Sequence, residues 1–204
     1  METNQSYKNR ALATLEGKWT TAAIASLIYL IISEGVIWMI TTLMGMDSST
    51  ASGIELIWTI LCLPLGWGIS IFFLNMVRNA NPSYESLFDG YKDFARIFLA
   101  GFLVVSASLI GCLFFIVPGI IVGLMFSQTD YILKDNKELG AIDAIKKSVE
   151  MMKGHKMELF WLMLSFIGWF ILCVLTVGIG FLLFQPYFET TLSHYYEDLK
   201  KESF

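Results

Sequence analysis

Six apolar segments take up most of this chain and restrict what it can fold into. A helix needs about 20 mostly apolar residues to cross the roughly 30 Å of hydrocarbon in a bilayer, and a spanning segment must satisfy its own backbone polar groups. Hydrophobic residues make up 55% of the sequence and charged residues only 16%, against about 25% charged residues in soluble domains. We therefore predict an all-α, polytopic membrane protein with a single domain over residues 1–204. The expected spans are 19–44, 54–77, 97–117, 119–133, 157–177 and 181–196.

Proline and glycine residues punctuate these spans. Pro64 is expected to kink the second span. The pair Pro118-Gly119 predicts a tight turn between the third and fourth spans, and Gly178-Ile179-Gly180 predicts another between the fifth and sixth. The spans therefore group into three helical hairpins.

The positive charges support this count of six spans. All fourteen Lys and Arg residues fall in four segments: before the first span, between the second and third, between the fourth and fifth, and after the sixth. The other three connections carry none. Because positively charged segments stay on the cytoplasmic side, we expect both termini to be cytoplasmic.

Amphipathic cytoplasmic helices are expected near 5–16, 82–90 and 137–153, directly before the first, third and fifth spans. In the third of them Ile142, Ile145, Val149 and Met152 share one face, and Asp135 with Glu138 is placed to form a capping box.

Each of the three ends in a similar motif, which suggests three related units: LEGKW at 15–19, FDGYKDF at 88–94 and MKGHKMELF at 152–160. We interpret the glycines of these motifs as helix stops in a left-handed conformation and the lysines as anchors at the lipid headgroups. These residues are Gly17, Lys18, Gly90, Lys92, Gly154 and Lys156.

Three carboxylates, Glu34, Asp130 and Glu189, lie inside predicted spans. A charge in hydrocarbon costs at least about 2.5–3.5 kcal/mol on insertion scales, so we expect Glu34 and Glu189 to face the protein interior. One interpretation of the three is an intramembrane site for a proton or cation. The other is that they are protonated carboxyls hydrogen-bonded across helices, or that Asp130 reaches toward Lys134.

The remaining patterns indicate packing and not chemistry. The sequence has no HExxH, GxSxG, Walker or Cys-His motif, so we expect no catalytic residue, no cofactor and no metal. We interpret His155 as an interfacial side chain, because a single histidine lacks the spacing of metal ligands. Gly119, Gly123 and Ser127 are spaced four apart, which favours close approach of another helix.

From Ser148 onward the chain resembles a family of bacterial polytopic membrane proteins known only as a domain of unknown function, number nine-seven-five. The likeness also includes GKW at 17–19 and the Pro118-Gly119 hairpin. The resemblance implies a bacterial cytoplasmic (inner) membrane protein with six or so helices, and it brings no established activity. The matching positions are Ser148, Met152, Gly154, Lys156, Phe160, SFIGW at 165–169, Gly178, Gly180, Pro186, Tyr187, Tyr195 and Tyr196.

Two functions from different classes fit these observations. The first is a non-enzymatic scaffold or accessory protein whose partners are membrane lipid, other membrane proteins or a second copy of itself; no feature suggests nucleic acid. The alternative is a small proton- or cation-linked transporter or channel that uses Glu34, Asp130 and Glu189. A continuous polar cavity touching the carboxylates would favour transport, and a dry packed core would favour the scaffold.

Overall fold

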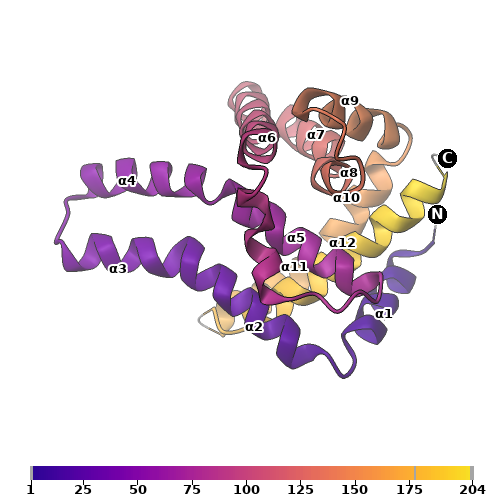
Figure 1. The fold of residues 1–204 in the computed structure, drawn as a ribbon, viewed down its shortest axis with the longest axis horizontal. Helices are drawn as coiled ribbons and strands as arrows, with labels where there is room; N and C mark the ends of the chain where they lie inside the picture. Colours follow the sequence, from indigo (N-terminus) through magenta and orange to yellow (C-terminus); the bar gives the residue numbers. More distant parts are fainter. Residues whose placement is uncertain (1, 177, 203–204) are drawn as a thin grey trace.

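The computed structural model describes residues 2–176 and 178–202, and every regular element in those ranges is a helix (Figure 1). The predicted all-α class is therefore confirmed. In chain order the elements are α1 (Asn4–Leu15), α2 (Trp19–Leu30), the π-helical turn η1 (Ile31–Gly35), α3 (Val36–Leu43), α4 (Ser48–Leu61), α5 (Leu63–Val77), the 3₁₀-helix η2 (Tyr84–Tyr91), α6 (Phe94–Phe114), α7 (Ile116–Phe126), α8 (Thr129–Asp135), α9 (Ala141–Met151), α10 (Lys156–Leu164), α11 (Ile167–Leu175) and α12 (Phe181–Glu202).

Several of these helices are long and apolar enough to cross a membrane. Within the described residues they are Trp19–Leu43, Phe94–Leu113, Ile116–Asp135 and Lys156–Leu175. The helices α4 and α5 add a fifth candidate if they count as one span, because they meet at an angle of 45°. This bend falls where Pro64 opens α5, so the expected kink is confirmed.

The last expected span differs from the others. Residues 181–196 fall within α12, which is not among the membrane-length candidates and contains Pro186. Its polar side chains Thr190, Thr191, Ser193 and His194 are buried against the rest of the protein. The low hydropathy of α12 therefore comes partly from polar groups that face inward and partly from its charged C-terminal turns. Val177, the last residue of the expected fifth span, lies outside the described residues.

The turn between α6 and α7 comes three residues earlier than Pro118 predicts. The chain reverses at Phe115, which is extended with φ −162° and ψ 147°. Pro118 instead sits in the first turn of α7, where its missing N–H costs no hydrogen bond. Gly119 lies against α6 so closely that a Cβ there would be 2.1 Å from the Cys112 sulfur. Pro118 and Gly119 therefore allow α6 and α7 to pack closely, but they do not form the turn between them.

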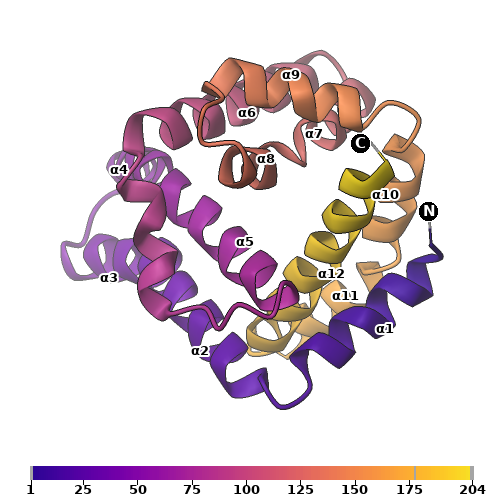
Figure 2. The ribbon, with the colours of Figure 1, turned by 45° about the vertical axis from the view of Figure 1, so that its right-hand side comes forward.

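The helices that begin each of the three suggested units pack on the helices that end the unit before it. α5, α8 and α12 lie near the centre (Figure 2). η2 packs on α5, α9 packs on α8, and α1 packs on α12, which closes a ring. In the same order α6 packs on α5, α10 on α7, and α2 on α12. This cyclic order agrees with the three related units suggested by the sequence.

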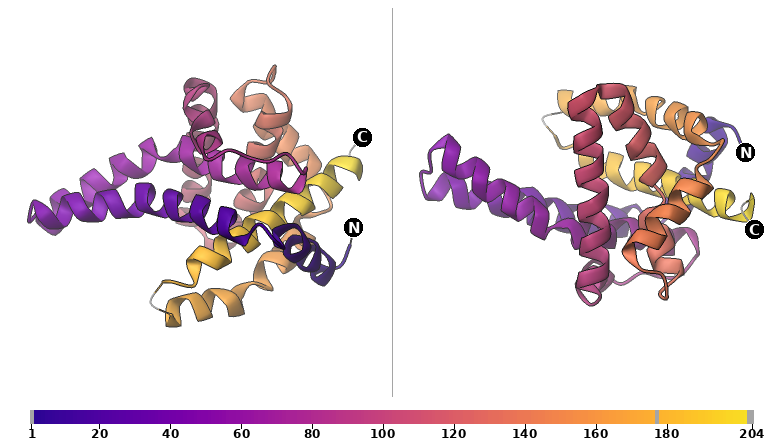
Figure 3. Two further views of the ribbon diagram at one scale, coloured as in Figure 1. Left: turned by 60° about the horizontal axis from the view of Figure 1, so that its bottom comes forward. Right: turned by 90° about the horizontal axis from the view of Figure 1, so that it is seen from above.

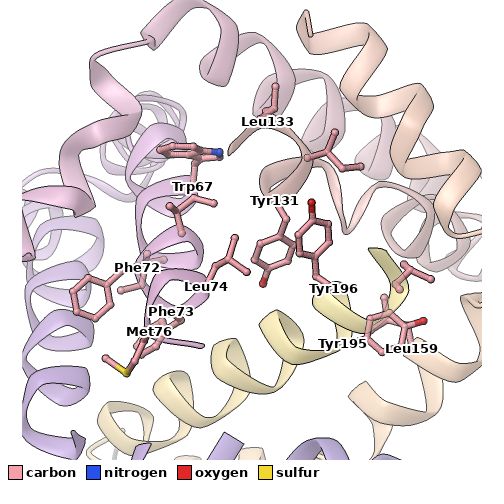
Figure 4. Close-up of a cluster of buried hydrophobic side chains, with 14 of the residues drawn as sticks. Trp67, Phe72, Phe73, Leu74, Met76, Tyr131, Leu133, Leu159, Tyr195 and Tyr196 are labelled. Carbon is pink, nitrogen blue, oxygen red and sulfur yellow. The ribbon is translucent and has the colours of Figure 1, made fainter. Parts of the chain in front are cut away.

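The core fills the space between the central helices (Figure 4). The rings of Tyr131 on α8 and Tyr196 on α12 stack with centroids 4.8 Å apart. Phe72 and Phe73 on α5 meet edge to face at 5.4 Å, and Leu159 joins the core from α10. In contrast, α3 and α4 project beyond the rest of the molecule (Figure 3).

The helices α1, η2 and α9 correspond to the three predicted amphipathic helices and are called surface helices below. Each has a side chain that donates a hydrogen bond to a backbone carbonyl where a long helix is interrupted. Such carbonyls need partners because hydrocarbon offers none. The Tyr91 hydroxyl of η2 donates to Leu61 O at the α4–α5 bend, at 3.1 Å. The Lys8 ammonium of α1 donates to Ser165 O between α10 and α11, at 2.8 Å. Burial lowers the pKa of this lysine.

The third interruption, between α7 and α8, is bridged by Ser148 of α9. Its hydroxyl donates to Met125 O at 2.8 Å and accepts from Gln128 N at 3.2 Å. Ser148 is fully buried. Ser148, the first residue of the segment that resembles the family, therefore holds α7 and α8 in register.

The surface helices differ in detail from the sequence predictions. The second is a 3₁₀-helix that continues past Gly90 to Tyr91, so Gly90 does not end it and has no left-handed conformation. A Cβ on Gly90 would lie 2.3 Å from Pro64 O, so the residue allows η2 to touch α5. Lys92 follows η2 and pairs with Asp89 at 2.7 Å.

In the third surface helix the predicted face is offset. Its buried residues are Ala141, Ala144, Ser148, Met151 and Met152, whereas Ile142 is 56% exposed. The expected capping box is absent from α9, because Gly140 precedes the helix and makes no side-chain cap.

Gly154 and Gly17 both adopt the left-handed conformation expected of helix stops, with φ of +87° and +73°. Lys18 directly precedes α2, and Lys156 is the first residue of α10. We expect Gly154→Val to lower the free energy of unfolding by about 1–3 kcal/mol, because a β-branched residue is strained at this φ. Thermal unfolding in detergent measures the loss.

His155→Ala is the matched control for that substitution. The His155 ring contacts Glu158 at 2.9 Å on the surface, and surface ion pairs contribute about 0–1 kcal/mol. A loss for His155→Ala as large as that for Gly154→Val would contradict the helix-stop interpretation.

Candidate functional site

A cavity of about 310 Å³ brings together two of the three predicted intramembrane carboxylates. It lies between α2, η1, α4, α5, α6 and the α7–α8 bend. Glu34 and Asp130 both line it, and they are 96 positions apart in the sequence. The other polar side chains in its wall are Tyr29, Ser33, Thr59, Cys62, Trp67, Ser127 and Thr129.

Glu34 is presented to the cavity by the π-helical turn η1. Such turns interrupt an α-helix and often occur at functional sites. The Trp58 indole N–H of α4 braces the turn by donating to Ile32 O at 3.0 Å and Ser33 O at 3.1 Å. Glu34 itself is exposed, and it lines the cavity with Asp130.

Asp130 is held on the opposite wall by α8. The Trp67 indole N–H of α5 donates to Asp130 O at 3.0 Å, and Trp67 also lines the cavity. The main chain of Asp130 is therefore held in place where this residue lines the cavity. Lys134 does not pair with it: the Lys134 ammonium lies 6.0 Å from the centroid of the Trp67 ring.

Glu189 lies outside the cavity, in the polar interior beside it. Its Oε2 atom is buried and has no hydrogen-bond partner among the described residues, while the carboxyl interacts with Ser70 on α5. The expected interior position therefore holds for Glu189.

A second polar cluster, absent from the sequence predictions, joins the charged segments. Asp135 accepts from both terminal nitrogens of Arg78 at 2.7 and 2.8 Å, from the Lys200 ammonium at 2.7 Å and from the Tyr196 hydroxyl at 2.8 Å. Arg78 also pairs with Glu197 at 2.6 Å. The ends of α5, α8 and α12 therefore meet at one carboxylate.

A repeat signal in the sequence points to this cluster. Arg78 follows Pro64 by fourteen residues, and Lys200 follows Pro186 by the same interval. Aligning the two hairpins on their prolines would have paired these two cations.

The first and last segments meet through Arg10 and Asp198, which are hydrogen-bonded. Burial raises the pKa of Asp198, but hydrogen bonds from Arg10 and Lys201 outweigh that effect and the net pKa is lowered. The hydrogen bond to Asp198 raises the pKa of Arg10. The Asp198 carboxylate is therefore favoured in its charged form by the α1–α12 contact.

The predicted small-residue stripe divides into two environments. Gly119 packs on α6, whereas Gly123 and Ser127 line an apolar groove between α7 and α10. No atom lies within 4 Å of a Cβ built at Gly123. Among the described residues no group of three or more His, Cys, Asp or Glu side chains is placed to hold a metal ion.

Comparison with known proteins adds a family and no activity. A family model described as protein of unknown function (DUF975) matches residues 100–203, about half of the chain. No curated protein and no solved structure matches the chain. The matched range contains Asp130, Asp135 and Glu189, whereas Glu34 lies before it.

Proposed function

We propose that this chain, which belongs to the family described as protein of unknown function (DUF975), is a non-enzymatic multi-pass protein of the bacterial cytoplasmic membrane that binds a proton or small cation between Glu34 and Asp130. The observation that carries the proposal is that both carboxylates line one cavity. Acidic residues are rare in membrane helices and usually mark ion or proton pathways.

The proposed topology has six spans in three hairpins, with both termini in the cytoplasm. Its support is that the four positively charged segments gather in one region. The Arg10–Asp198 pair joins the first to the last, and Asp135 joins its own segment to those of Arg78 and Lys200. Because α12 buries its polar groups inside the protein, it can be the sixth span despite its composition.

The proposed site has an open side and a closed side. Glu34 is exposed and lines a second surface hollow with Thr59 and Glu55, so an ion reaches it first. Asp130 lies deeper, on a helix packed against the core. Glu189 lies beyond them in the protein interior, where its Oε2 atom is buried and has no hydrogen-bond partner among the described residues. Such a series of acids suits the passage of protons better than the binding of a large solute.

Reconstitution tests the proposal directly. The purified full-length protein in proteoliposomes should dissipate an imposed pH gradient, as followed by a trapped pH-sensitive dye. We expect Glu34→Gln and Asp130→Asn each to slow this flux by about tenfold or more while the protein still folds, because the amide keeps hydrogen bonding but cannot carry the charge.

Glu150→Gln serves as the matched control, because Glu150 is an exposed carboxylate on α9 away from the cavity. It should leave the flux unchanged. If wild-type liposomes lose the gradient no faster than empty ones under proton, sodium and potassium gradients alike, the proposal is wrong.

A scaffold role is the second candidate, and the projecting α3–α4 hairpin favours it (Figure 3). Trp38, Leu43, Leu56 and Ile57 are all more than 60% exposed on this hairpin. Outside the shelter of the central helices they offer an apolar surface to lipid or to another membrane helix. Absence of flux in the reconstitution would favour this role.

A further inference from the structure

A second cavity, of about 370 Å³, lies on the other side of Trp67 and Ile97 from the carboxylate site. Four cations, Lys92, Arg96, Lys134 and Lys137, share its wall with the carboxylates Asp89 and Asp93. The cavity therefore has a net charge of +2, whereas the carboxylate site is acidic. From this arrangement we propose that the cavity binds the phosphate headgroup of an anionic phospholipid through Lys134 and Lys137.

Two of the four cations are already committed to protein groups. Lys92 pairs with Asp89 at 2.7 Å and Arg96 with Asp93 at 2.6 Å. Arg96 also donates to three carbonyls in the last turn of α8 and just after it, those of Leu133, Asn136 and Leu139, at 3.1–3.3 Å. Arg96 therefore positions the segment that carries Lys134 and Lys137. Its guanidinium charge is balanced by Asp93 and is not available to a ligand.

Of the four cations of this cavity, Lys134 and Lys137 have no carboxylate partner among the described residues. Lys134 is half-buried and its ammonium lies over the Trp67 ring, while Lys137 is exposed at the rim. Two uncompensated ammonium groups on one cavity attract an anion with about two charges or several acceptor oxygens. A phosphate group has that chemistry.

The position of the cavity favours a lipid over a dissolved anion. It lies where α6 begins, at Phe94, and where the candidate span ending at Asp135 stops. The beginning of one candidate span and the end of its neighbour therefore both border the cavity. This places the cavity at the level of the lipid headgroups. Its wall includes the apolar side chains of Trp67, Ile97 and Leu133, which suit the glycerol and upper acyl chain of a lipid. Basic pockets between membrane helices on the cytoplasmic side are a recognised form of headgroup site.

The test measures binding of phosphatidylglycerol and phosphatidylcholine to the purified full-length protein in neutral detergent, by native mass spectrometry. We expect phosphatidylglycerol to bind in preference to phosphatidylcholine. The double variant Lys134→Gln/Lys137→Gln should weaken phosphatidylglycerol binding by about 30-fold, as two lost surface cations predict. Lys134→Arg/Lys137→Arg should retain binding, because the charge remains.

The matched control is Lys146→Gln/Lys153→Gln, which removes two exposed lysines outside the cavity from the same segment. It should leave binding within about twofold of the wild type, since the charge of a distant lysine is screened. An equal loss in the control would show general electrostatic attraction and overturn the site.

Inorganic phosphate separates the two sources of the same chemistry. Without lipid it should bind far more weakly than phosphatidylglycerol and fail to displace it. If phosphate binds equally well, the lipid proposal is wrong. These measurements need no ion flux, so the lipid site and the proposed proton or cation site can fail independently.

Discussion

Replacing Asp135 by asparagine is expected to lower the free energy of unfolding by about 2–4 kcal/mol, although the shape of the side chain is nearly unchanged. Asp135 is the common acceptor for Arg78, Lys200 and Tyr196, and its side chain is only 11% exposed. The amide removes the negative charge, so two cations are left facing each other across a partly buried site. The asparagine side chain would keep one acceptor oxygen, which is why the loss is not larger.

Unfolding in detergent, followed by circular dichroism or by steric trapping, measures the effect. Asp143→Asn is the matched control: Asp143 lies on α9, its side chain is 62% exposed and it pairs with Lys146 at 3.4 Å. Surface pairs of this kind contribute about 0–1 kcal/mol. Similar losses for both variants would show that Asp135 does not join the three central helices.

The ion pairs of Asp135 also help to explain how α5, α8 and α12 are aligned. The apolar surfaces of these helices hold them together without fixing their rotation or register, since apolar contact is non-directional. The fork of Arg78 on Asp135 has a defined geometry, and such paired donors add specificity as well as energy. We infer that the cluster sets the relative position of the three helices at their charged ends.

Much of the fold follows from local properties of the sequence. The helices, the bend at Pro64 and the left-handed Gly154 each depend on a few adjacent residues, so hydropathy and backbone preferences were sufficient. Pro118 shows the limit of this reasoning, because proline is acceptable both in a turn and in the first turn of a helix. Only the packing of Gly119 on Cys112 decides between the two.

The candidate site depended more on tertiary structure. Sequence reasoning found Glu34, Asp130 and Glu189 because charged residues stand out in apolar helices. It could not show that Glu34 and Asp130 share a cavity while Glu189 lies beside it, since that depends on how α2, α8 and α12 pack. Asp135 was interpreted only as part of a helix cap, because an acid at a helix end is ordinary in sequence and its three partners come from elsewhere in the chain.

Substituting Gly68 by alanine is expected to destabilise the protein by about 1–3 kcal/mol or more, although alanine is the better helix former. A Cβ at Gly68 would lie 1.9 Å from Leu87 O and 2.7 Å from Leu87 C. Both are backbone atoms of η2, so no side-chain rotation relieves the clash. The methyl group would push η2 away from α5, and Gly90, which meets Pro64 O on the same interface, would lose its contact as well.

Gly66→Ala is the control, because it makes the same change two residues away on the same helix. No atom lies within 4 Å of a Cβ built at Gly66. Alanine favours a helix over glycine by about 0.8–1 kcal/mol, so this variant should unfold at the wild-type temperature or above it. Thermal unfolding of the two variants in one detergent therefore gives changes of opposite sign. If Gly68→Ala changes the unfolding temperature in the same way as Gly66→Ala, η2 does not pack on α5 as the structure places it. The Tyr91 hydroxyl would then not be held where it donates to Leu61 O.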